Sequence, residues 1–141
     1  MTALHTAGAD RPRVTIDLEA ALRAHAGGLL CTEAAVELLI GHRSWLLRTV
    51  FVERFVEELD VAVPGAIVDW SGAVAALQSG GLPCSSSEAQ MLRIAASLAE
   101  GVEVDLRDAV CGLDAANAAL VADALLHAAG HRRRFDAPRA R

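Results

Sequence analysis

Residues 44–59, Ser-Trp-Leu-Leu-Arg-Thr-Val-Phe-Val-Glu-Arg-Phe-Val-Glu-Glu-Leu, most constrain what this chain can fold into. Wound as an α-helix at about 100° per residue, they carry apolar side chains on most of the circumference. One stripe consists of Trp45, Val52, Val56 and Leu59, and a second consists of Leu46, Leu47, Val50, Phe51 and Phe55. Because a helix with two apolar stripes must be covered from two directions, we predict a central helix over residues 44–59.

Apolar periodicity and helix-end signals predict the remaining elements. Further helices are expected over about 15–26, 32–40, 70–78, 86–100, 105–112 and 115–129. The clearest start signal is Ser85-x-x-Glu88, which has capping-box spacing. The fragments 61–63 and 66–68 have an extended character but are too few to predict a sheet. The sequence therefore predicts an all-α, single-domain bundle of about six or seven short helices around the central helix.

The charge is distributed unevenly along the chain. Residues 14–130, the predicted helical domain, carry 6 Arg against 16 acidic residues, a net charge of −10. Residues 1–13 are predicted to be a disordered N-terminal arm, and residues 131–141 a basic disordered tail with a net charge of +4. The arginines of this tail are Arg132, Arg133, Arg134, Arg139 and Arg141.

Composition favours a cytoplasmic protein. No apolar run approaches the roughly 18 residues that cross a bilayer, and the N-terminus shows no secretory signal. All 13 basic residues are arginine, which indicates a GC-rich bacterial genome. The three cysteines are odd in number and widely spaced, so we expect free, reduced thiols.

Cys84 is the best-placed nucleophile in the chain. It comes directly before a predicted helix N-terminus, where the helix dipole lowers the pKa of a thiol. A thiol-dependent enzyme acting through Cys84 is therefore one alternative. The competing interpretation is that Pro83-Cys-Ser-Ser-Ser87 is an ordinary loop and helix cap, with Cys84 packed as a small apolar residue.

Other catalytic and metal-binding patterns are weak or absent. His127 and His131 have a spacing that zinc ligands use, but Gly130 ends the helix between them. Ser44 and His42 flank a turn, without the Gly-x-Ser-x-Gly pattern of a nucleophile elbow. We therefore predict no catalytic, metal-binding or cofactor-binding residue and no cofactor, and we favour a protein that is not an enzyme.

Association with a protein partner is the leading functional hypothesis. We expect a regulatory or structural protein that forms a homodimer through the stripe of Trp45, Val52, Val56 and Leu59. The back of the last helix is mostly alanine, so another helix could approach it closely. A further alternative is an accessory nucleic-acid-binding protein that uses the basic tail, although the acidic domain would repel the same polyanion.

Overall fold

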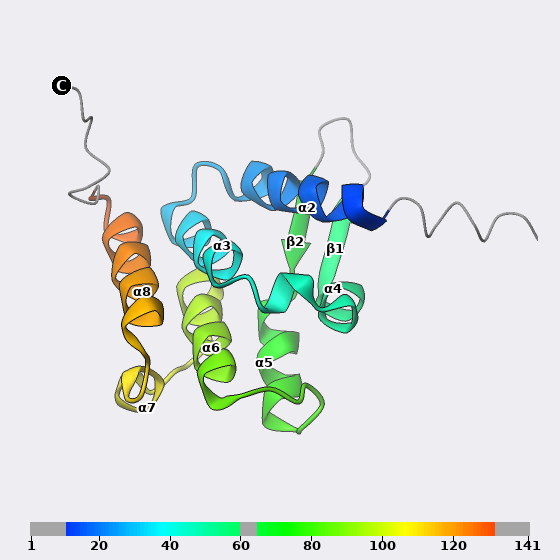
Figure 1. Cartoon of the computed structure of the whole chain (residues 1–141). Coiled ribbons are helices and arrows are strands. Elements are labelled where there is room, and N and C mark those ends of the chain that lie inside the picture. The colour runs from blue at the N-terminus through cyan, green and yellow to red at the C-terminus, as the bar shows by residue number, and fades with distance from the viewer. Residues whose placement is uncertain (1–10, 60–64, 132–141) are drawn as a thin grey trace, which may run out of the picture.

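The computed structural model describes residues 11–59 and 65–131, with side chains described from residue 18 onward (Figure 1). In order, its elements are α2 (Arg11–Ala26), α3 (Leu30–His42), the short 3-10 helix η1 (Trp45–Leu47), α4 (Thr49–Phe55), β1 (Val56–Leu59), β2 (Gly65–Val68), α5 (Trp70–Gln78), α6 (Ser86–Glu100), α7 (Leu106–Val110) and α8 (Ala115–Ala128). Seven α-helices, one 3-10 helix and one two-stranded sheet make up this part of the chain. The prediction of a mostly helical, single-domain fold is confirmed.

The helix-end signals are mostly confirmed. Ser85 and Glu88 form the reciprocal capping box at the start of α6, and Gly101 ends that helix with a left-handed φ of 71°. Asp69 and Asp114 cap α5 and α8 by accepting hydrogen bonds from backbone N–H groups. Side chains that hydrogen-bond the backbone N–H groups of their own helix therefore predict where that helix begins.

Two predicted boundaries in the N-terminal part of the chain are wrong. Helix α2 begins at Arg11, inside the predicted N-terminal arm, of which residues 1–10 lie outside the described part of the chain. Helix α3 begins at Leu30 rather than near residue 32 as predicted, and its N-cap residue makes no side-chain hydrogen bond. The carboxylate of Glu33 instead accepts a hydrogen bond from the Gly28 N–H at 2.8 Å and supports the turn before α3.

The predicted central helix over residues 44–59 is wrong, because the segment divides into η1, α4 and β1. Arg48 has an extended backbone (φ −91°, ψ 115°) that separates η1 from α4. Trp45 and Phe51 are six residues apart and would point about 120° away from each other on one helix. The break at Arg48 lets both rings enter the same core, where their centroids are 5.1 Å apart.

The second change of structure occurs at Val56, where α4 gives way to a strand. Strand β1 pairs antiparallel with β2, with Val56 opposite Val68 and Leu59 opposite Gly65. The expectation that no sheet forms is therefore wrong. The predicted extended fragment 66–68 lies within β2, whereas the fragment 61–63 lies outside the described residues.

Helix α3 occupies the centre that had been assigned to residues 44–59. It packs against α2, α6, α8 and η1 (Figure 1). Its buried residues are Ala34, Ala35, Val36, Leu38 and Leu39. All fully buried residues of the described chain are apolar, so burial of hydrophobic area is the main force holding these helices together. No described helix has both the length and the apolar content to span a membrane.

Candidate functional site

The start of α6 holds a dense polar cluster centred on the Glu88 carboxylate. Glu88 Oε1 accepts hydrogen bonds from Arg48 Nη2 at 2.6 Å and from the Ser85 N–H at 2.9 Å. Glu88 Oε2 accepts a short hydrogen bond from the Ser44 hydroxyl. The Glu88 backbone carbonyl accepts one from Trp45 Nε1 at 2.9 Å. We call these five residues the Glu88 cluster; they join η1 to the N-terminus of α6.

The hydrogen bonds in the Glu88 cluster stabilise the charged form of the carboxylate. The Ser44 hydroxyl, the Ser85 N–H and the Arg48 guanidinium together lower the pKa of Glu88 to about 2. Arg48 also donates to the Pro83 carbonyl at 2.7 Å and lies 4.5 Å above the centre of the Trp45 ring. The cluster thus satisfies its polar groups internally, which points to a structural role for Glu88.

Cys84 lies beside this cluster, and the pKa of its thiol is shifted in the direction opposite to the one predicted. Burial and the negative charge of Glu88 raise the pKa of the Cys84 thiol, and the positive charges of Arg48 and Arg93 only partly offset them. The predicted lowering of its pKa is therefore wrong. A raised pKa reduces the thiolate fraction near neutral pH, so it disfavours the hypothesis of a thiol-dependent enzyme.

The predicted interface stripe does not form a single surface. Trp45 is fully buried, whereas Val52 and Val56 are partly buried against the core and Leu59 is partly buried in β1. Because these residues belong to three different elements, they share no helix face. Trp45 cannot anchor a partner at the protein surface in this fold.

The histidines weighed as metal or catalytic residues have separate environments. His127 Nε2 lies 2.7 Å from Glu33 Oε1, and His131 is exposed beyond the end of α8. Burial lowers the pKa of His42, whose Nδ1 is buried with no hydrogen-bond partner among the described residues. Within the same residues, no three His, Cys, Asp or Glu side chains converge as a metal site would require. Arg132, Arg133, Arg134, Arg139 and Arg141 lie outside the described part of the chain.

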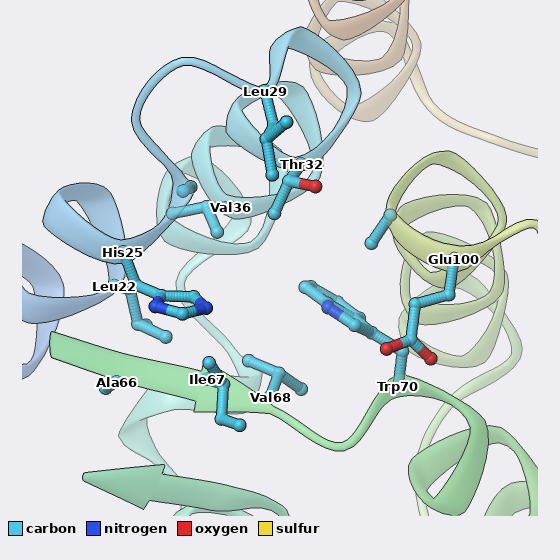
Figure 2. Close-up of a pocket in the computed structure, with 12 residues that line it drawn as sticks. Leu22, His25, Leu29, Thr32, Val36, Ala66, Ile67, Val68, Trp70 and Glu100 are labelled. Atoms are coloured by element: carbon cyan, nitrogen blue, oxygen red, sulfur yellow. The ribbon is translucent and has the colours of Figure 1, made fainter. Parts of the chain in front are cut away.

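A pocket of about 240 Å³ opens where α2, α3, β2, α5 and α6 meet (Figure 2). We call it the Trp70 pocket, because the indole ring of Trp70 projects into it from the start of α5. Its walls are mainly aliphatic, including Leu22, Val36 and Val68. The polar side chains that line it are His25, Thr32 and Glu100.

A larger groove of about 370 Å³ lies between α3 and α8. Its floor includes Leu38 and Leu120, and charged side chains form part of its rim. Two of these, Arg23 and Glu37, are already paired with each other, with Arg23 Nε 2.7 Å from Glu37 Oε2. The groove therefore offers less unpaired polar chemistry than the Trp70 pocket.

Helix α8 exposes an apolar face on the side opposite its packing surface. Val121 and Ala124 are buried where α8 meets the rest of the fold, and its main neighbour there is α3. The exposed positions of the opposite side fall within an arc of about 100° and contain no charge. We call them the α8 outer face, and they are Ala115, Ala118, Ala119, Ala122, Leu126 and Ala129.

The alanine back of α8 is evident in the sequence, whereas most of the other site residues are not. Ser44 and Arg48 reach Glu88 across separations of 44 and 40 residues, so no local pattern links them. Trp70 and His25 come together only because β2 packs against α2. Comparisons with protein-family models, curated proteins and solved structures find no match for this chain.

Proposed function

We propose that the protein acts by association with other proteins, and specifically that it forms a homodimer through the α8 outer face. The observation that carries the proposal is an exposed apolar face, free of charged residues, on a helix whose opposite face already packs on α3. Figure 1 places α8 at one edge of the molecule, with α3 and α6 on its inner side. A second helix has room to approach from the outside.

The composition of the α8 outer face suits a second copy of the same helix. Alanine side chains are small, so two such helices can pack with their backbones close together. In a two-fold symmetric pair, each copy presents the same patch to the other. An antiparallel arrangement brings Asp114 at the start of one α8 near His131 at the end of the other, and it aligns the two helix dipoles favourably.

The dimer is expected to be weak and reversible. Helix α8 has 14 residues, and a single pair of helices of this length buries less than the roughly 1,200 Å² that marks the low end of stable interfaces. We therefore expect a dissociation constant on the order of micromolar or weaker. Such a protein would form and lose its dimer as its concentration changes, which suits a regulatory role.

Sedimentation velocity over a wide concentration range tests the proposal. Ala122→Glu places a charge at the centre of the α8 outer face and should shift the protein to monomer. Ala116→Glu is the matched control, because Ala116 is exposed on the same helix but lies outside that face. Both substitutions put glutamate at an exposed helical position, so circular dichroism should show both variants folded.

Two results would contradict the proposed homodimer. A wild-type protein that remains monomeric up to about 1 mM would exclude a dissociation constant in the micromolar to millimolar range and would contradict the proposal. Equal dimerisation of Ala122→Glu and the wild type would place the interface elsewhere. We also propose a cytoplasmic setting, which is supported by three free cysteines at positions 31, 84 and 111.

A further inference from the structure

The Trp70 pocket contains a hydrogen-bond donor without a partner. Trp70 is only 4% exposed, and no acceptor among the described residues bonds its indole N–H. The nitrogen is nevertheless in contact with solvent. Among the described residues, His42 Nδ1 is the one side-chain nitrogen or oxygen that is both fully enclosed and without a hydrogen-bond partner. Figure 2 shows the ring extending into the pocket, so the N–H is available to a molecule bound there.

A tryptophan with this degree of burial usually has its N–H bonded. Trp45 follows that rule, because its Nε1 donates to the Glu88 carbonyl at 2.9 Å. A ligand that carries a hydrogen-bond acceptor would supply what Trp70 lacks. The indole N–H and the aliphatic walls of Leu22, Val36 and Val68 favour a largely apolar body with a hydrogen-bond acceptor at its edge.

The charged groups of the pocket restrict the ligand further. Glu100 is an exposed carboxylate at the end of α6 and lines the pocket together with the hydroxyl of Thr32 and the imidazole of His25. No arginine lines the pocket, and residues 14–130 have a net charge of −10. These charges disfavour anions and favour a neutral or cationic ligand with an amino group directed at Glu100.

The volume of the pocket limits the size of the ligand that it can hold. Its volume of about 240 Å³ is below the range of about 300–1,000 Å³ that is typical of drug-sized sites. This volume favours a ligand of one or two fused rings over a larger one. We propose that the Trp70 pocket binds a small planar heteroaromatic amine of the size of a nucleobase, with an acceptor on Trp70 and an amino group on Glu100.

Adenine is a suitable probe, because it combines ring nitrogens that accept hydrogen bonds with an exocyclic amine. The full-length protein should bind adenine with a stoichiometry of one in isothermal titration calorimetry. Benzoate has a similar flat ring but carries a negative charge, so it should bind at least about tenfold more weakly. Adenosine monophosphate distinguishes a free base from a nucleotide as the ligand, and its phosphate should weaken binding in the same way.

Three variants test which groups make the site. Trp70→Phe keeps an aromatic ring but removes the N–H, and it should weaken adenine binding by about tenfold. Glu100→Gln should weaken binding severalfold, whereas the matched control Glu103→Gln should not, because Glu103 is exposed but does not line the pocket. Ala99→Leu adds bulk to the pocket wall and should abolish binding while circular dichroism shows a folded protein.

The proposal is overturned if adenine shows no saturable binding, or if benzoate binds as tightly as adenine. It is also overturned if Ala99→Leu leaves the affinity unchanged, since the ligand would then sit elsewhere. If Trp70→Phe does not fold, the comparison of adenine affinity between Glu100→Gln and Glu103→Gln is sufficient to test whether the ligand binds in the pocket. None of these results depends on dimer formation, which sedimentation of the same samples reports separately.

Discussion

The two tryptophans of this chain are both buried, but only one of them has a hydrogen-bond acceptor for its indole N–H among the described residues. Trp45 is fully buried, and its ring contacts Phe51 and the Arg48 guanidinium while its N–H bonds the Glu88 carbonyl. Trp70 is almost as buried, but its N–H faces the Trp70 pocket without an acceptor. The first region is complete within the chain, whereas the second leaves space and an unused donor.

Helix α6 connects the two regions. It begins at the Glu88 cluster and ends with Glu100 at the rim of the Trp70 pocket. The comparison shows that polar residues near a helix terminus do not by themselves mark a functional site. The Glu88 cluster contains Glu88 with its lowered pKa and lies beside Cys84 with its raised pKa, yet the polar groups of the cluster are satisfied internally. The pocket with unused polar groups is the better candidate for binding.

The largest expected contrast is between Trp45→Phe and Trp70→Phe. Trp45→Phe removes a buried hydrogen bond and leaves a cavity, so it should cost about 3 kcal/mol of unfolding free energy. Trp70→Phe removes an N–H that has no protein partner and should cost about 1 kcal/mol or less. Urea unfolding of both variants measures the difference. Equal losses would show that the two regions are not distinct.

Glu88→Gln tests the cluster directly and should cost about 2 kcal/mol at neutral pH, because it weakens the capping box and the pair with Arg48. The pKa of Glu88 falls to about 2 on folding, below the usual value of about 4.3. The charged form therefore stabilises the fold above pH 4.3, and this contribution is lost as the pH falls towards 2.

Unfolding of the wild type and of Glu88→Gln should accordingly differ at pH 7 and converge near pH 2. Glu103→Gln is the control, since Glu103 is exposed and its carboxylate forms no ion pair with the described residues. A stability gap between wild type and Glu88→Gln that does not change between pH 7 and pH 2 would argue against an ionised Glu88 as its source.

Cys84 should react more slowly than the other two cysteines. Its pKa is raised by burial and by Glu88, whereas Cys31 and Cys111 are exposed. We expect alkylation of Cys84 near neutral pH to be slower by about tenfold, because the thiolate is the reactive form. Mass spectrometry after timed treatment with iodoacetamide gives the order of modification. Preferential labelling of Cys84 would restore the hypothesis of a reactive thiol.

The smallest expected effect lies at the far end of α6. Gly101 has a φ of +71°, which an L-amino acid with a side chain adopts at a cost. Gly101→Ala should therefore destabilise the protein by about 1 kcal/mol. Gly27→Ala is the control, because Gly27 has no positive φ and an added Cβ would make only ordinary contacts. Similar losses in both variants would contradict a role for the left-handed conformation.

Local chemistry determined the parts of the fold that the sequence alone predicted. Ser85 and Glu88, Asp69 and Asp114 each bond to backbone groups within three residues, so their patterns predict helix starts without knowledge of the rest of the chain. The apolar back of α8 was also visible, because it needs only the periodicity of one helix. The overall helical class followed from the same local signals.

Only the tertiary structure decided the fate of residues 44–59. Their periodicity fits one continuous helix, but placing Trp45 and Phe51 in one core requires the break at Arg48, and pairing with β2 draws residues 56–59 into a strand. The gain from burying two aromatic rings and forming a backbone ladder outweighs the weak intrinsic preference of this segment for helix. The Glu88 cluster and the Trp70 pocket depend on contacts across tens of residues, and no local pattern encodes them.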